Sequence, residues 1–409
     1  MLVILYYIIF SISFVYAMYF ALTGLFGFKN YHKSQFGRHK PKHKFGIVIA
    51  TRNEEKVVGA LIKSLQKQKY PKDLYEIFVV PNNCTDNTEG VAREAGATII
   101  NCTVPVKFKA DALKFTFHEL QSRDDIDAFV VFDADNLVHP DFLARMNDAL
   151  CEGVQVAQAF RDAKNMGDNW LTGSYTLFYF IQNFFYNRAR MNYSGSATIN
   201  GTGFMMRKEV VKDGFNTVTI TEDSEFTAQC AIRGIQVAFV EDAITYDEHP
   251  MTFSASWKQR KRWTSGTLNC LTVYWKKLLS TFVKTGNIAC FDMVMMFLAP
   301  IMMLVSSALS IVLILFHIAG VELFDFFSYL YASGIIFFVL FYFLSVLMNV
   351  FVVKYNHKRP KDVLSGIFLF CLFLLSWIPI NIVCLFKKTE SWEYIKHDRS
   401  DVDLDKLLN

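Results

Sequence analysis

Four long apolar segments constrain this chain more than any other feature of its sequence. They lie at 2–28 and at about 291–319, 326–353 and 363–386. Each is longer than the ~20 residues that an α-helix needs to cross ~30 Å of hydrocarbon. Hydrophobic residues make up 52% of the chain, yet charged residues still reach 20%. The hydrophobic and the charged residues must therefore lie in separate parts of the chain. We therefore predict a membrane protein with a polar domain between its first and second spans.

Clusters of basic residues indicate which side of the membrane the polar domain occupies. The segment 29–44 carries nine Lys, Arg and His residues and no acid, and basic residues beside a span are retained on the cytoplasmic face. By the same rule the basic segment 354–361 lies inside and the acidic segment 321–325 lies outside. We predict a multi-pass protein of the cell membrane with a cytoplasmic polar domain. Lys387 and Lys388 leave the side of the tail open, because Pro379 also allows a re-entrant hairpin.

The polar domain has the sequence pattern of an α/β fold. Apolar runs at 45–50, 75–80, 97–100 and 128–132 predict strands, and the segments 54–69, 88–95 and 109–120 predict helices. This alternation is typical of a mostly parallel sheet with helices on both faces. In such sheets ligands gather at the carboxyl ends of the strands. Polar residues follow three of the predicted strands, at 51–54, 82–86 and 133–135.

These patterns divide the chain into six predicted parts. They are a transmembrane helix at 1–28, a basic cytoplasmic linker at 29–44, an α/β domain at 45–252, interfacial amphipathic helices at 253–285, about three transmembrane helices at 286–388 and a polar tail at 389–409. The interfacial assignment rests on Lys and Arg residues interleaved with Trp257, Trp263 and Trp275. A surface helix of a soluble domain has a similar pattern, but here apolar segments follow at once. The net charge of +4 gives no indication of nucleic acid.

Two aspartates separated by one residue follow the predicted strand at 128–132. Asp133 and Asp135 would face the ligand crevice, where their carboxylates can hold a hard divalent cation, Mg²⁺ or Mn²⁺. Such an ion binds a diphosphate and neutralises the charge that a departing nucleoside diphosphate gathers. Two acids at this spacing are common in proteins, so the prediction depends on their place after a buried strand.

A second acidic motif, Thr221-Glu-Asp223, precedes a predicted helix. The local sequence leaves two interpretations open. As helix N-caps, these side chains would satisfy free backbone N–H groups. Alternatively, Asp223 would take the proton from an attacking hydroxyl as a general base.

A third motif, Gln259-Arg-Lys-Arg-Trp263, stands just before the last apolar segments. Arg260 and Arg262 can each donate two hydrogen bonds to diphosphate oxygens. Trp263 offers a flat apolar face of the kind that stacks on sugar rings. The motif is also compatible with a basic interfacial helix, so these two interpretations do not exclude each other.

Seven motifs occur along the chain in the order found in one enzyme family. They are Ala50-Thr-Arg-Asn-Glu-Glu55, Asn83-Cys-Thr-Asp-Asn-Thr88, Lys109-Ala-Asp-Ala-Leu113, Asp133-Ala-Asp135, Asn200-Gly-Thr-Gly203, Thr221-Glu-Asp223 and Gln259-Arg-Lys-Arg-Trp263. With spans at both ends, the chain resembles the membrane-integrated branch of family 2 glycosyltransferases, which includes the cellulose, chitin, hyaluronan and poly-N-acetylglucosamine synthases. The resemblance implies a GT-A fold, a UDP-sugar donor, Mg²⁺ or Mn²⁺, and inversion at the anomeric carbon by direct displacement.

The resemblance also implies a role for each matching residue. The implied donor-binding residues are Thr51, Arg52, Glu54, Asn83, Asp86, Lys109 and Asp133. Asp135 and Asp133 would hold the metal, and Asp223 would be the base. The implied strip along the diphosphate and the acceptor end comprises Glu222, Gln259, Arg260, Arg262 and Trp263. At Pro81-Asn82-Asn83 the chain lacks an acid that relatives commonly carry, although Asn82 can still hydrogen-bond a uracil edge.

Three functions stay open at this point. The first is a processive polysaccharide synthase that exports a growing glycan through its membrane helices, with a possible accessory export subunit. The second is a transferase that adds one sugar to a lipid or lipid-linked acceptor, which needs the same donor site and no channel. A remote third is a non-catalytic membrane receptor that senses a nucleotide.

Overall fold

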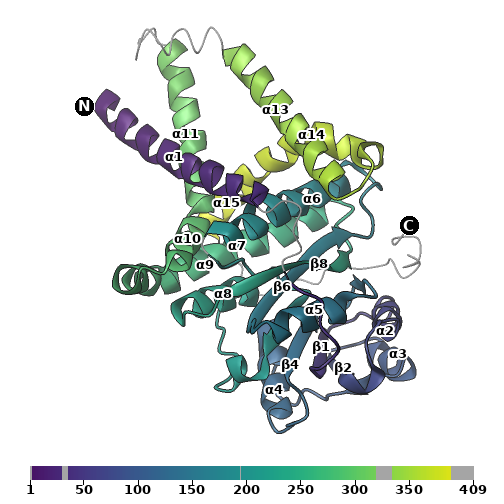
Figure 1. Cartoon of the computed structure of the whole chain (residues 1–409). Coiled ribbons are helices and arrows are strands. Elements are labelled where there is room, and N and C mark those ends of the chain that lie inside the picture. Colours follow the sequence, from purple (N-terminus) through teal and green to yellow (C-terminus); the bar gives the residue numbers. More distant parts are fainter. Residues whose placement is uncertain (1, 30–35, 194, 319–333, 388–409) are drawn as a thin grey trace.

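The computed structural model describes residues 2–29, 36–193, 195–318 and 334–387. Three predicted features therefore lie wholly or partly outside the described residues: part of the basic linker, at 30–35, the acidic segment at 321–325 and the tail at 389–409. The described parts fall into a sheet-containing domain and a group of apolar helices at the opposite end of the molecule (Figure 1).

One mixed sheet organises the polar domain, and among the described residues it has eight strands in the order β3-β2-β1-β4-β7-β6-β8-β5. The strands are β1 (Phe45–Thr51), β2 (Tyr75–Pro81), β3 (Thr98–Ile99), β4 (Ala128–Phe132), β5 (Leu137–Val138), β6 (Val156–Ala163), β7 (Phe204–Arg207) and β8 (Val237–Asp247). Strands β3, β2, β1 and β4 pair in parallel, whereas β7 runs antiparallel to β4 and β6. The predicted α/β fold with a GT-A-type sheet is confirmed.

Helices cover both faces of this sheet because both faces are apolar. On β1, Val48 belongs to one hydrophobic core, and its neighbours Ile47 and Ile49 belong to the other, as the two-residue period of a strand requires. The helices of the domain are α2 (Val58–Gln66), α3 (Thr88–Glu94), α4 (Lys109–Leu120), α5 (Phe142–Cys151), α6 (Trp170–Ile181), α7 (Ala189–Tyr193) and α8 (Glu222–Ile232). Short helical turns are η1 (Leu25–Phe28), η2 (Lys72–Leu74), η4 (Lys208–Val211) and η5 (Pro360–Val363), and η3 (Gln182–Arg188) is a π-helix.

Seven further helices make up the rest of the described chain. They are α1 (Leu2–Gly24), α9 (Phe253–Thr285), α10 (Ile288–Phe297), α11 (Ala299–Ile318), α13 (Gly334–Tyr355), α14 (Leu364–Leu375) and α15 (Trp377–Phe386). By length and composition, the segments Ile4–Phe28 and Pro360–Phe386 are long and apolar enough to cross a membrane. The pair Ile288–Phe297 and Ala299–Val312 adds a third candidate span if counted as one, although it is bent by 52°.

Helix α9 corrects one detail of the predicted division. The segment 253–285 was predicted to contain several amphipathic helices, whereas the structure has one continuous helix of 33 residues there. It begins at Thr252, whose side chain accepts a hydrogen bond from the N–H of Ala255, and ends at Gly286 in the left-handed conformation. One rigid helix thus connects the sheet domain with the apolar helices (Figure 1).

The sheet domain and the apolar helices share a hydrophobic core. Val48 of β1 and Phe370 of α14 lie in the same cluster of buried side chains. Helices α6 and α14 approach closely at two glycines, since a Cβ atom on Gly366 would lie 2.5 Å from the backbone carbon of Gly173. This contact leaves no room for a side chain at Gly366 and very little at Gly173.

A buried ion pair connects three segments that are distant in sequence. The guanidinium of Arg190 in α7 donates to both carboxylate oxygens of Asp292 in α10, over distances of 3.0–3.2 Å. Tyr19 of α1 and Tyr186 of η3 donate their hydroxyls to the same carboxylate, at 2.6 and 3.2 Å. Because Arg190 is fully buried, this network holds α1 and α10 against the sheet domain.

The connection between α13 and α14 also contacts the sheet domain. Lys358 lies 2.9 Å from the buried carboxylate of Asp162 on β6, and the hydroxyl of Tyr355 donates to Glu241 on β8 at 2.8 Å. The basic segment 354–361 and the sheet domain therefore lie on the same side of the apolar helices.

Candidate active site

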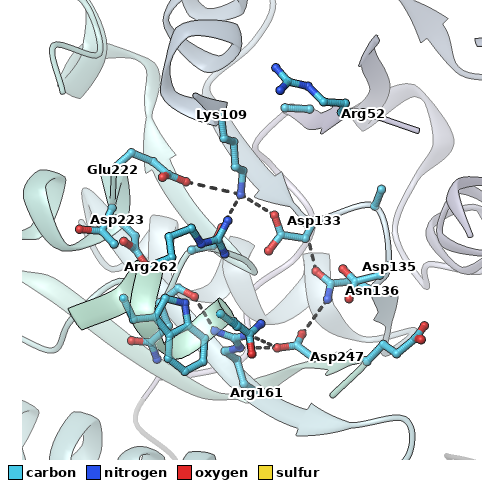
Figure 2. A pocket seen from close by; sticks show the side chains of 18 of the residues that line it. Arg52, Lys109, Asp133, Asp135, Asn136, Arg161, Glu222, Asp223, Asp247 and Arg262 are labelled. Atoms are coloured by element: carbon cyan, nitrogen blue, oxygen red, sulfur yellow. Dashed lines mark hydrogen bonds and ion pairs between the residues drawn. The ribbon is translucent and has the colours of Figure 1, made fainter. Parts of the chain in front are cut away.

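A cavity of about 160 Å³ lies where the carboxyl ends of β1, β2 and β4 meet. The three polar segments that follow these strands contribute to it, as predicted from their positions in the sequence. Its wall contains most of the predicted site residues: Thr51, Arg52, Glu54, Lys109, Asp133, Asp135, Glu222, Asp223, Gln259, Arg262 and Trp263. Figure 2 shows how the charged side chains converge on it.

Lys109 is the cation at the centre of this cavity. It begins α4, and its ammonium donates to Asp133 at 2.6 Å and to the carbonyl of Gly201 at 2.7 Å, with Glu222 3.7 Å away (Figure 2). Burial works against its charge, but these acids outweigh that effect and raise the pKa of Lys109. The ammonium is therefore a permanent positive charge among carboxylates.

The two acids of the Asp133-Ala-Asp135 motif both line the cavity. The backbone N–H of Asp133 is fixed by Thr202 at 3.0 Å and Asn136 at 3.2 Å. Burial alone would raise the pKa of Asp133, but the ammonium of Lys109 lowers it, so the carboxylate stays charged. Its side chain is 41% exposed, through the cavity.

These two carboxylates fit a divalent cation that a substrate helps to hold. Among the described residues no cluster of three or more His, Cys, Asp or Glu side chains forms a complete protein site for a metal. Mg²⁺ is commonly bound by one or two carboxylates, with substrate phosphates and water as its other ligands. Asp133 and Asp135 supply that number of carboxylates beside Lys109.

A second charged network borders the cavity, and the sequence reasoning missed it. Arg161 of β6 forms an ion pair with Asp247 at the end of β8, and Asp247 accepts a hydrogen bond from Asn136 at 2.6 Å (Figure 2). Arg161 also donates to the carbonyl of Asn200 at 2.5 Å and lies 4.1 Å from the ring centroid of Tyr179. The signal available in the sequence was one more strand that ends in an acid, at Asp247.

The candidate base, Asp223, lies in the first turn of α8 and faces the cavity (Figure 2). Burial raises its pKa, although the N–H of Ser224 and nearby cations oppose that shift. A carboxylate with a raised pKa is a stronger base. The carboxylate of Asp223 lies close to the backbone at Gly201, where a Cβ atom would be 3.2 Å from it. Gly201 also has φ +84°, a conformation that glycine adopts without strain.

The motif on α9 divides between two surfaces of that helix. Gln259, Arg262 and Trp263 line the cavity as predicted. Arg260 does not, so the structure does not bring it to the predicted diphosphate strip. Its side chain is fully buried on the other side of the helix, where it donates to the carbonyl of Phe373 at 3.2 Å and to the hydroxyl of Ser376 at 2.7 Å.

Two predicted donor residues also lie away from the cavity. Asp86 instead accepts hydrogen bonds from the hydroxyl of Thr88 at 2.5 Å and from the N–H of Glu55 at 3.1 Å, so it organises the turn before α3. The exposed Asn83 donates to the carbonyl of Val106 at 3.0 Å. Asn82 takes the place beside the cavity and accepts from Arg52 at 2.9 Å.

A second cavity, of about 360 Å³, adjoins the first. It lies between the sheet domain and helices α9, α10, α11 and α15. The two cavities have wall residues in common, namely Arg161, Tyr179, Asn200, Thr221, Asp223 and Trp263. The carboxylate of Asp223 therefore stands at the boundary between a polar cavity and a cavity that reaches the apolar helices.

The sheet and the acidic cavity at its strand ends define a GT-A-type α/β protein. A family model described as "Glycosyltransferase like family 2" matches residues 41–266, more than half of the chain, and the chain belongs to this family. The narrower resemblance to the cellulose, chitin and hyaluronan synthase branch stays a prediction.

Among the curated relatives of the chain are three that are each less than 30% identical to it. The chain is 29% identical over 284 residues to a probable glycosyltransferase, YdaM, of Bacillus subtilis (64% of this chain, 66% of the relative). It is 25% identical over 261 residues to the beta-monoglucosyldiacylglycerol synthase of a Nostoc species (62% and 54%). A probable glucomannan 4-beta-mannosyltransferase of Arabidopsis thaliana is 26% identical over 263 residues (59% and 48%). The matches thus span about half to two thirds of each relative's length.

One solved structure has the same fold along nearly the whole chain. It is a mannosyltransferase from Pyrobaculum calidifontis, determined in complex with GDP-Man and Mn²⁺. The TM-score is 0.61 at 16% sequence identity, and the match covers 95% of this chain and 100% of the other. At this identity the likeness extends to the fold alone.

Proposed function

We propose that this chain is an inverting glycosyltransferase that moves a sugar from a UDP-sugar donor to an acceptor hydroxyl. One observation carries the proposal: Asp223 stands at the boundary of two adjoining cavities. A transferase needs a base that reaches both the sugar of the donor and the hydroxyl of the acceptor. The first cavity would hold the donor and the second the acceptor.

In the proposed reaction, Asp223 accepts the proton of the acceptor hydroxyl while its oxygen attacks the anomeric carbon. The bond from that carbon to the diphosphate breaks on the opposite face, so the anomeric configuration inverts and UDP leaves. Lys109 and Arg262, which line the donor cavity, stabilise the negative charge on the diphosphate. A divalent cation on Asp133 and Asp135 would supply Lewis-acid stabilisation of the same charge.

The donor base would lie against the residues that follow β1 and β2. Thr51, Arg52, Glu54 and Asn82 line that part of the cavity. The Asn82 side chain is held by Arg52 and by the carbonyl of Thr51, at 2.8 Å from its amide nitrogen. An oriented amide can hydrogen-bond a uracil edge, which supports UDP as the nucleotide.

We further propose a multi-pass arrangement in the cell membrane, with the catalytic domain in the cytoplasm. The basic segment 354–361 contacts that domain through Lys358. The residue after η1, where the basic linker begins, contacts it through Asn192, which donates to the carbonyl of Lys29 at 3.2 Å. Basic segments beside spans are retained in the cytoplasm, so both contacts favour the same orientation.

The acceptor is either a growing glycan or a lipid. The names of two relatives support one acceptor each: one is a glucosyldiacylglycerol synthase, and the other is a glucomannan mannosyltransferase. A processive synthase would extend its glycan through the second cavity and export it, with or without an accessory subunit. A single-addition transferase would hold a lipid there instead.

The proposal is tested with the purified full chain and a set of UDP- and GDP-sugars, read by release of the nucleoside diphosphate. Release with one donor is expected in Mg²⁺ or Mn²⁺. Chelation by EDTA should reduce it to background, and added metal should restore it. If the chain binds nucleotide but releases no nucleoside diphosphate from any donor, the proposed enzymatic function is contradicted and the nucleotide-sensing receptor is favoured.

Replacing Gly266 should impair catalysis from a distance. A side chain at this position on α9 would collide with Thr221, which directly precedes Glu222 and Asp223. We expect Gly266→Val to lower kcat about tenfold or more, because displacing a catalytic group by about 1 Å can cost about 100-fold. The control is Thr272→Val on an exposed face of the same helix. Equal kcat values for the two variants would contradict this role.

Glu222 should make donor affinity depend on pH. Burial raises the pKa of Glu222 to about 7, despite the nearby Lys109. As pH rises from 6 to 8 the side chain ionises, and its charge repels the donor diphosphate. We expect the KM for the donor to rise about fivefold, which corresponds to about 1 kcal/mol of added repulsion. In Glu222→Gln the KM should change much less with pH, and an unchanged profile would remove Glu222 as the cause.

A further inference from the structure

We infer that the second cavity binds the hydrocarbon part of an uncharged lipid, and that a free hydroxyl on this lipid is the acceptor at Asp223. The inference rests on the proposed function and names its acceptor class. It commits to a lipid alcohol, rather than a lipid phosphate or a growing glycan. The wall, the position and the charge of the cavity each support it.

The part of the cavity wall that α10, α11 and α14 form is apolar. It contains Met296, Pro300, Met303 and Leu374. Three polar side chains that also line the cavity form a chain of hydrogen bonds: Trp377 donates to Thr264 at 3.1 Å, Thr264 to Asn381 at 3.1 Å, and Asn381 to the sulfur of Met303 at 3.4 Å. A glycan would bring many hydroxyls into this space with few partners, which is costly in an apolar site, whereas a hydrocarbon chain needs none.

The cavity lies where a membrane lipid can reach it. Ala299 and Pro300 begin α11 at the 52° bend from α10, and both line the cavity. The cavity is also lined by Leu374 and Trp377, which lie in the candidate span Pro360–Phe386. Two of the candidate membrane segments therefore border the cavity directly, and Asp223 stands at its other end.

The charges at the boundary favour a neutral acceptor. Among the described residues of this cavity wall, Arg161 is the only cation and Asp223 the only acid. The guanidinium of Arg161 is already neutralised by Asp247 and donates to the carbonyl of Asn200. Lys109 and Arg262 line the first cavity, where the donor diphosphate would engage them. A lipid phosphate in the second cavity would therefore meet the Asp223 carboxylate and no further cation of that cavity's described wall. A hydroxyl fits the same place, because the carboxylate can accept its proton.

The test uses the full chain in detergent micelles, with the donor found by nucleotide release and three acceptors: dioleoylglycerol, a polyprenyl phosphate and a soluble oligosaccharide. We expect one sugar on dioleoylglycerol and none on the other two. Transfer to the phosphate or stepwise growth of the oligosaccharide would overturn the inference while the proposed function stands. The absence of any turnover with every donor would overturn both.

A matched pair of variants tests whether the cavity holds the chain. Ala299→Trp fills the cavity from the first turn of α11, whereas Ala308→Trp adds the same bulk to an exposed site that does not line it. The measured quantity is kcat/KM for dioleoylglycerol divided by that for dioctanoylglycerol. We expect this ratio to fall about tenfold in Ala299→Trp and to stay at the wild-type value in Ala308→Trp. The same ratio in both variants would overturn the inference.

Discussion

Asp223→Asn is expected to lose at least about 100-fold in turnover, the lower end of what a general base contributes. The amide has nearly the shape of the carboxylate but cannot accept the proton of the acceptor. Affinity for UDP should be unchanged or higher, because the substitution removes a negative charge from a cavity that binds a diphosphate. Turnover is measured by nucleotide release and affinity by calorimetric titration with UDP.

The matched control is Asp213→Asn, the same chemical change at an exposed acid outside both cavities. It should retain wild-type turnover. Asp223→Asn with both wild-type turnover and wild-type UDP affinity would remove this residue from the base role. A parallel loss of UDP binding would instead point to a damaged donor site.

The second large effect is expected on stability, from Arg190→Leu. This substitution leaves the carboxylate of Asp292 buried without its cation, with Tyr19 and Tyr186 as the remaining donors in the part of the chain that the structure describes. Breaking a buried ion pair in this way costs about 3–5 kcal/mol. For a chain of this size, the midpoint of thermal unfolding should fall by about 3–6 °C. The measurement is made on the full chain in detergent.

Two further variants test whether the unpaired buried charge, rather than another effect of the substitution, causes the loss of stability. In Arg190→Leu combined with Asp292→Asn, the uncompensated charge is gone and part of the lost stability should return. Arg93→Leu breaks an exposed pair with Glu89 one turn away on α3 and should change the midpoint little. If the single and double variants unfold at the same temperature, the unpaired carboxylate is not the cause.

Elements dominated by local pattern were predictable from the sequence. The predicted bounds of β4 and α4, 128–132 and 109–120, agree with the structure, because each is a regular apolar or amphipathic run. Strand β6 was not predicted, since Gln158, Arg161 and Asp162 interrupt its apolar pattern. Each of these side chains has a distant partner, the carbonyl of Thr202, Asp247 and Lys358 respectively. Such pairing is invisible in a single sequence.

Some residues of the candidate site were likewise predictable from the sequence, and others were not. Residues at strand ends, such as Asp133 and Asp135, were predictable because the sheet brings strand ends together. Asp86 does not line the cavity, because its side chain accepts hydrogen bonds from Thr88 and from the N–H of Glu55. Arg260 is different, since helical geometry already separates it from the site. Gln259, Arg262 and Trp263 share a face at spacings of three and four, whereas Arg260 is turned by about 100°.

The close contact of Gly173 with Gly366 has a consequence for how the chain is made. Helix α6 belongs to the sheet domain, but α14 covers it and is synthesised about 190 residues later, after most of the apolar helices. At ~5–20 residues per second, α6 must wait for roughly 10–40 s after it emerges. During that interval its face toward α14 is uncovered. The chain should therefore acquire its final shape only when α14 has been made and has packed against α6, and nascent chains that stop short of α14 should be targets for chaperones and proteases.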